Sequence, residues 1–196
     1  MNPFVKRHPM KITSLFAVAA LAVPAFAADY SLELKPGNTK VQWTLGDVLH
    51  TVHGTFKVKQ GEINFNTENG NASGRVVVDV TSGESGSDAR DSRMHSNVLE
   101  SKKYPEAVFV PAHFDGTLSV PGTATVKVQG TLTIHGAAHP VTMEVQTTTT
   151  AEQMQAKMSF DIPYVTWGMK DPSTFLLKVN KAVQMSIETT GPLQKK

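Results

Sequence analysis

Histidine pairs are the first residues in this sequence whose type and spacing could support chemistry. Seven histidines occur in 196 residues, and the pairs His50/His53 and His135/His139 have spacings found between metal ligands. On a strand, residues three apart point to opposite faces, so His50 and His53 would converge only across a turn. Neither an HExxH motif, a cysteine nor an acidic cluster accompanies the pairs. We therefore expect hydrogen-bonded structural histidines and no metal site.

A nucleophilic active site is not indicated either. Ser92, His95 and Ser96 lie close together in the sequence, but catalysis needs a nucleophile, a base and an orienting group within reach. The sequence has no GxSxG motif, and the glycines between Ser82 and Ser87 are not followed by the Lys-Ser/Thr of a phosphate loop. We therefore predict a protein that is not an enzyme and needs no cofactor; the alternative is a His-dependent enzyme.

A short helix that carries an arginine is predicted between two strands. Arg90, Met94 and Val98 are four residues apart, so they share one face of about three helical turns. Asp88 is placed to cap the start of this helix, and Tyr104-Pro105 ends it, because proline forces the preceding residue into an extended conformation. Such a helix, set between strands, is either a lid over the end of a barrel or a connector that plugs its core.

The N-terminal segment has the composition of a secretory signal peptide. Residues 1–11 carry three basic side chains and no acidic one, residues 12–23 are mostly apolar, and Ala25-Phe26-Ala27 is a small-x-small cleavage pattern. We predict cleavage after Ala27, which leaves residues 28–196 as one domain in the periplasm. The alternative is a retained membrane anchor.

The composition of the remaining chain excludes several kinds of partner and site. Without the three basic residues of the segment, sixteen basic side chains face seventeen acidic ones, and this balance argues against nucleic-acid binding. There is no cysteine, so disulfides, thiol nucleophiles, thiolate zinc sites and iron–sulfur clusters are excluded. The core alone must hold the domain together.

Alternating apolar residues predict an all-β domain of about eight strands joined by short turns, which favour antiparallel pairing in a barrel or sandwich. A turn at Gln60-Gly61 is expected to separate two of the strands. The clearest alternating sets are Val41, Trp43 and Leu45; Val76, Val78 and Val80; Val126, Val128, Leu132 and Ile134; Val141, Met143 and Val145; and Val183, Met185 and Ile187.

Alternation alone does not say whether the apolar face points into the barrel or towards lipid. An outer-membrane barrel needs aromatic girdles, whereas only 7% of this chain is aromatic. Several of the predicted strands have five or six residues, and Lys and Glu occupy alternate positions in most of them. We therefore predict a barrel with an apolar interior, which at eight strands is wide enough for one small ligand.

Several motifs resemble the YceI-like family of exported lipocalin-like proteins, named for polyisoprenoid binding. They are Val52–Phe56, similar to an early G-x-F strand; Arg90–Ser96 with Lys103–Pro105 and Phe109, similar to the central signature; Val128–Gly136, similar to the T-I-H-G hairpin; and Trp167–Ser173, similar to a late W-G…P-S loop. The resemblance implies an eight-stranded antiparallel lipocalin-like barrel with an internal apolar tunnel that binds isoprenoids or other amphiphiles without catalysis. Asn97, Val98 and Leu99 depart from the bulky aromatics usual after the family's helix.

This resemblance and the strand faces together give a set of expected ligand contacts. The predicted tunnel residues are Trp43, Leu45, Phe56, Val80, Met94, Leu99, Phe109, Leu132, Ile134, Met158, Phe160 and Trp167, and Arg90 is expected at the mouth. The alternative for Arg90 is a structural pairing with Asp91 or another carboxylate. The alternative for the tunnel is a barrel filled by side chains, as in a structural or stress-related interaction protein.

The expected partner is a long-chain lipid such as a polyprenyl phosphate, a quinone, a fatty acid or a fatty amide. Binding is expected to serve transport, storage or a stress response, with at most transient membrane contact, in a monomer or homodimer. The apolar faces indicate how a tail would be held, and they leave the identity of the head group open.

Overall fold

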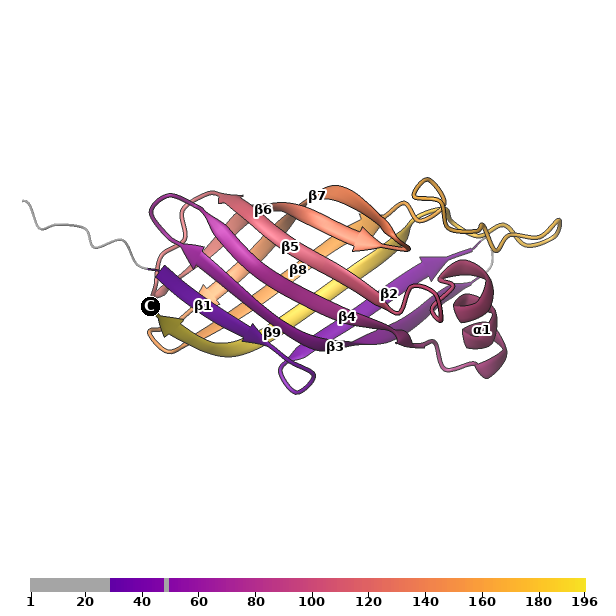
Figure 1. Cartoon of the computed structure of the whole chain (residues 1–196), viewed down its shortest axis with the longest axis horizontal. Coiled ribbons are helices and arrows are strands. Elements are labelled where there is room, and N and C mark those ends of the chain that lie inside the picture. The colour runs from indigo at the N-terminus through magenta and orange to yellow at the C-terminus, as the bar shows by residue number, and fades with distance from the viewer. Residues whose placement is uncertain (1–28, 48–49) are drawn as a thin grey trace, which may run out of the picture.

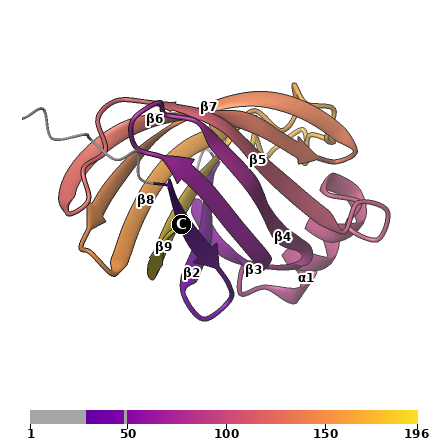
Figure 2. The same cartoon turned by 60° about the vertical axis from the view of Figure 1, so that its left-hand side comes forward.

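Apolar residues at every second position produce nine strands in the part of the chain that the computed structural model describes, residues 29–47 and 50–196. The strands are β1 (Asp29–Leu34), β2 (Thr39–Gly46), β3 (Thr51–Asn66), β4 (Ala72–Glu84), β5 (Glu106–Asp115), β6 (Gly122–Ile134), β7 (Ala137–Thr149), β8 (Gln153–Ile162) and β9 (Val183–Lys195). All pairings between them are antiparallel, and they close into a barrel (Figures 1 and 2). The predicted cleavage site and the segment before it lie outside the described residues.

The nine strands occupy eight positions around the barrel. Both β1 and β2 lie between β3 and β9, one after the other along the axis: Leu32 pairs with Ile63 and Leu193, and Trp43 pairs with Gly54 and Met185. The turn after β1 separates the two, with the Asn38 N–H donating to the Lys35 carbonyl at 3.0 Å. The prediction of an eight-stranded antiparallel barrel is therefore confirmed.

Strand length is where the sequence-based expectation was wrong. The predicted turn at Gln60-Gly61 is instead the middle of β3, which runs through sixteen residues. The pairing of β3 with β4 shifts register between Val58 and Gln60, so a bulge takes up the irregularity and the strand continues. Similarly, β5 and β8 each extend over ten residues, whereas several strands were predicted to have only five or six.

The described helical segment covers one end of the barrel (Figure 1). It consists of α1 (Asp88–Arg93) and the following π-helical turn η1 (Met94–Val98). Asp88 is not the cap that we expected, because Ser87 takes the N-cap position and makes no side-chain cap bond. Asp91 accepts hydrogen bonds from the backbone N–H and the hydroxyl of Ser85, and so fixes the approach to the helix.

Two non-glycine residues with left-handed backbone conformations, His135 and Glu100, connect the end of this segment to the barrel. The turn between β6 and β7 is His135-Gly136, with φ of 51° and 79°, and Glu100 after η1 has φ of 45°. His135 Nε2 lies 2.7 Å from Glu100 Oε2, and the Tyr104 ring lies 4.4 Å from the imidazole. The helical lid is thus tied at its C-terminal side to the β6–β7 hairpin.

No helix in residues 29–47 and 50–196 is long and apolar enough to span a bilayer.

Candidate functional site

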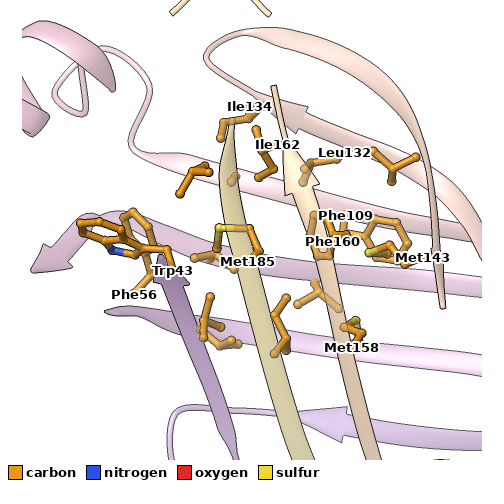
Figure 3. A pocket seen from close by; sticks show the side chains of 18 of the residues that line it. Trp43, Phe56, Phe109, Leu132, Ile134, Met143, Met158, Phe160, Ile162 and Met185 are labelled. Atoms are coloured by element: carbon orange, nitrogen blue, oxygen red, sulfur yellow. The ribbon is translucent and has the colours of Figure 1, made fainter. Parts of the chain in front are cut away.

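The inward faces of the strands surround a cavity of about 630 Å³. Figure 3 shows side chains from several strands converging on it, among them Leu132, Met158, Phe160 and Met185. Residues such as Met158 and Phe160 point inward and yet keep part of their surface accessible. Partial exposure of an inward-facing apolar side chain is expected when the space that it faces is unfilled.

Twelve of the thirteen predicted site residues line this cavity: Trp43, Leu45, Phe56, Val80, Arg90, Met94, Leu99, Phe109, Leu132, Ile134, Met158 and Phe160. They come from β2 to β6, from β8 and from the helical lid, as the alternating pattern and the helical spacing required. Their contact with a ligand remains a prediction.

Trp167 is the exception and does not line the cavity. Its indole stacks on the imidazole of His139, with ring centroids 4.0 Å apart and planes only 3° from parallel. The reason is that β8 ends at Ile162 and the chain turns, with the Trp167 N–H donating to the Pro163 carbonyl. The period of two therefore stops before Trp167, which the sequence reasoning had assigned to the inner face.

The histidines have structural contacts in the described part of the chain. His53 Nδ1 lies 3.0 Å from Thr44 Oγ1, His139 stacks on Trp167, and His135 pairs with Glu100. Within residues 29–47 and 50–196, no group of three or more histidine, aspartate or glutamate side chains is placed to hold a metal ion.

Sequence reasoning missed the contribution of the long loop between β8 and β9. Tyr164, Met169, Leu177 and Val179 come from this loop and line the cavity. The loop has no regular period, so only Trp167 was predicted from it, and Trp167 does not line the cavity. Its density of apolar residues between Tyr164 and Val179 was the available signal.

Aromatic rings lie flat on the barrel wall where glycines leave room for them. A Cβ atom on Gly54 would fall 2.3 Å from the indole of Trp43, and one on Gly130 would fall 2.7 Å from the ring of Phe109. Both rings therefore cover bare backbone on the neighbouring strand. By lying along the wall, they add apolar lining and leave the centre of the barrel open.

Aromatic packing closes the end of the cavity far from the lid. The rings of Tyr30 and Phe65 stack with centroids 5.7 Å apart, and Phe114 meets Phe65 edge-on at 6.4 Å. All three side chains are buried, and Leu118 is buried in the same core. Because this end is packed shut, the cavity has a floor.

Three threonine side chains in the deeper part of the cavity lining form hydrogen bonds within the barrel wall. Thr39 and Thr189 share a hydrogen bond of 2.9 Å between their hydroxyl oxygens, and the Thr147 hydroxyl donates to the Ala124 carbonyl at 3.2 Å. All three threonines are buried and line the cavity. The deep part of the lumen is therefore suited to a hydrocarbon chain.

Charged groups gather at the lid end of the cavity. Arg90 lies on the rim, where its Nε donates to Ser85 Oγ at 2.7 Å and a terminal nitrogen donates to the Ser85 carbonyl at 3.0 Å. The same Ser85 hydroxyl donates to Asp91, so Arg90 and Asp91 are linked through serine. Arg90 thus lies at the rim and is linked to the Asp91 carboxylate through Ser85, while its contact with a ligand head group stays a prediction.

A second, polar pocket of about 190 Å³ adjoins this rim. Arg93, Asn97, Lys170 and Ser173 contribute to it, and Arg93 also lines the main cavity. The pocket includes Asp171, whose pKa is held below its usual value by hydrogen bonds from Ser173 and by the charges of nearby lysines. Cationic and hydrogen-bonding groups therefore border the opening, whereas the interior is apolar.

Tyr164 is expected to lower the stability of the protein as the pH becomes strongly alkaline. It lines the cavity, its hydroxyl donates to the Asn180 carbonyl at 2.8 Å, and burial raises its pKa from 10.0 to about 12. Folding therefore retains a proton that the unfolded chain releases, so this contribution to stability is complete below pH 10 and is lost as the pH rises towards 12.

We expect the wild-type protein to lose about 2 to 3 kcal/mol of unfolding free energy relative to Tyr164→Phe between these pH values. Urea denaturation of both proteins across the range measures the effect. Parallel pH profiles would contradict the assignment.

Comparisons with known proteins agree with this geometry. The sequence pattern of the family described as the YceI-like domain matches residues 32–191. A UPF0312 protein of Pseudomonas putida (strain W619) is 32% identical over 124 residues, which are 61% of this chain and 62% of that protein. A UPF0312 protein of Vibrio campbellii is 32% identical over 142 residues, which are 68% of this chain and 72% of that protein. The match thus spans less than two thirds of the Pseudomonas relative.

Two solved structures share the fold at low sequence identity. A polyisoprenoid binding domain from Saccharophagus degradans superimposes with a TM-score of 0.64 at 17% identity, covering 85% of this chain and 98% of that chain. BcnA of Burkholderia cenocepacia superimposes with a TM-score of 0.64 at 19% identity, covering 78% of this chain and 96% of that chain. At these identities the likeness concerns the barrel architecture.

Proposed function

This chain belongs to the YceI-like domain family, and from that premise we propose that it is a periplasmic carrier that holds the tail of one long-chain amphiphile inside its barrel. The observation that carries this proposal is the apolar cavity of about 630 Å³, with a packed floor and a charged rim. A cavity of this size lies within the range of small-molecule sites. The periplasmic location rests on the predicted N-terminal signal.

The cavity volume limits the length of the tail that can be enclosed. A water molecule takes about 30 Å³ of liquid volume and a methylene group is of similar size, so 630 Å³ accommodates roughly twenty such groups. A fatty acyl chain or roughly four isoprene units would fill it. A longer polyprenyl chain would have to extend past the rim, between the lid and the loop that follows β8.

The tail is expected to set the affinity and the head group the selectivity. Each buried methylene contributes about 0.8 kcal/mol, so a filled cavity offers on the order of 16 kcal/mol before the costs of ordering the ligand. A charge-assisted contact from Arg90 or Arg93 to a phosphate or carboxylate contributes about 1.5 to 3 kcal/mol. A quinone or an amide would bind through its tail with a weaker contribution from the rim.

Native mass spectrometry of the protein, prepared from a periplasmic extract without detergent, tests the proposal. We expect a discrete mass above that of the polypeptide, which organic extraction releases as one lipid class. Protein that has been extracted should regain this mass when it is incubated with the released lipid, which serves as the control for carry-over. A bare polypeptide that stays bare after incubation with isoprenoids, quinones, fatty acids and fatty amides would contradict a carrier function.

A further inference from the structure

The loop between β8 and β9 presents two apolar side chains to solvent. Phe175 is 94% exposed and Leu176 is 90% exposed, the largest values among the exposed large hydrophobic residues of the described chain. In Figure 1 this loop extends beyond the barrel at the same end as α1, opposite the C-terminus. Neither side chain contributes to the core, so the fold itself gives no reason for their apolar character.

Hydrogen bonds define the shape of this tip. The Thr174 N–H donates to the Leu177 carbonyl at 2.8 Å, and the Leu177 N–H donates back to Thr174 Oγ1 at 3.1 Å. Phe175 and Leu176 therefore occupy the two central positions of a tight turn, where Gly, Asn, Asp or Pro is usual. The Val179 N–H donates to Ser173 Oγ at 3.0 Å, and Val179 forms an isolated antiparallel β-bridge with Asp47, which follows β2. The base of the tip is therefore joined to the barrel.

Basic residues flank the tip on both sides along the chain. The loop from residue 163 to residue 182 contains Lys170, Lys178 and Lys181 and a single acidic residue, Asp171. The carboxylate of Asp171 is occupied by hydrogen bonds from Ser173. Exposed aromatic and aliphatic side chains flanked by lysines are the combination that binds the interface of an anionic bilayer.

The tip is continuous with the opening of the cavity. Leu177 follows Leu176 directly and lines the cavity, as do Pro172 and Val179 from the same loop. A surface that engaged Phe175 and Leu176 would therefore lie against the rim. A lipid tail could then pass between that surface and the lumen with little exposure to water.

We propose that the turn Thr174–Leu177 is a membrane-docking tip, in which Phe175 and Leu176 enter the interface of an anionic bilayer and bring the rim of the barrel onto it. The proposal goes beyond the carrier function, because docking does not depend on which cargo is held. It commits to a lipid surface as the partner because the lysines provide charge complementarity to anionic head groups.

Vesicle flotation of the full mature protein tests this docking. The vesicles contain phosphatidylcholine and phosphatidylglycerol in equal parts, and wild type is compared with the double variant Phe175→Ser/Leu176→Ser. We expect wild type to float with the vesicles and the double variant to lose about tenfold or more of its partition coefficient, because two exposed apolar side chains no longer bury. Binding of wild type should weaken with added salt and on vesicles of phosphatidylcholine alone.

Val110→Ser is the matched control, since Val110 on β5 is an exposed apolar residue away from the loop, at 44% exposure. It should bind as wild type does. Wild type that stays in the soluble fraction, or a double variant that floats like wild type, would overturn the proposal. A tip-dependent change of sedimentation coefficient without vesicle binding would also overturn it, because the tip would then join two copies of the chain.

The flotation assay follows the protein, whereas the native mass measurement follows the cargo. Docking can therefore fail while the protein still carries a lipid. Equally, a polypeptide that stays bare in the mass spectrometer can still float with vesicles, so the two proposals fail separately.

Discussion

Met158→Trp is expected to weaken lipid binding by at least a hundredfold while leaving the barrel folded. Met158 lies on β8, points into the cavity and keeps part of its surface accessible (Figure 3). An indole at this position would stand across the lumen and block the space beyond it. Even four methylene groups denied burial would cost about 3 kcal/mol, which is roughly a hundredfold in the dissociation constant.

The stability of the same variant separates a hollow barrel from a filled one. Overpacking a filled core costs about 1 to 3 kcal/mol, whereas a ring that enters empty space displaces no neighbour. We expect an unfolding free energy close to that of wild type, measured by urea denaturation of the lipid-free proteins, together with the loss of binding in a fluorescent fatty-acid titration.

Ser159→Trp is the matched control, because the neighbouring residue on β8 is exposed on the outer face. It should bind lipid as wild type does. Unchanged affinity in Met158→Trp would contradict binding in the lumen. A loss of stability in Met158→Trp, together with no lipid binding by either wild type or Met158→Trp, would indicate a filled barrel.

Phe114→Ala is expected to destabilise the protein by about 3 to 5 kcal/mol. The Phe114 side chain is 5% exposed and packs edge-on against Phe65 at the closed end of the cavity. Its removal leaves a void that the strands around it cannot fill, because hydrogen bonds to both neighbours hold each strand in place. The midpoint of urea denaturation should fall with little change in slope.

Phe175→Ala makes the same chemical change at a site that is 94% exposed. It should alter the unfolding free energy by no more than about 0.5 kcal/mol, as surface substitutions usually do. Equal effects of the two substitutions would show that the cluster of Tyr30, Phe65 and Phe114 does not stabilise the barrel.

Much of the cavity wall could be predicted from the sequence because side-chain direction in a strand has a period of two. Once the apolar face is taken as the inner one, residues such as Leu132, Phe109 and Phe160 are assigned to the lumen without knowledge of strand order. The period of two gave no guidance at Trp167, which lies in an irregular segment after β8 and stacks on His139 although it was predicted to line the tunnel. Sequence reasoning also predicted β3 as two strands separated by a turn, because a bulge and a turn have similar signals in a single sequence.

Whether the barrel is hollow could not be derived from composition. The free volume depends on where the large rings lie, and this is set by partners on neighbouring strands such as Gly54 for Trp43 and Gly130 for Phe109. Such pairings become visible only when the register is known. The docking tip was missed for a related reason, since exposure of Phe175 and Leu176 depends on the shape of a loop without a period.

The position shared by β1 and β2 has a consequence for how the chain folds. Both strands close the barrel against β9, and one of the contacts at this seam, between Thr39 and Thr189, joins residues 150 positions apart. Hairpins such as β6–β7 can form locally, but the seam requires closing a loop of almost the whole chain, which raises the contact order and slows folding. Until that step is complete, β2 and β9 expose edges with unpaired backbone N–H and C=O groups, which are prone to aggregation by pairing with other chains.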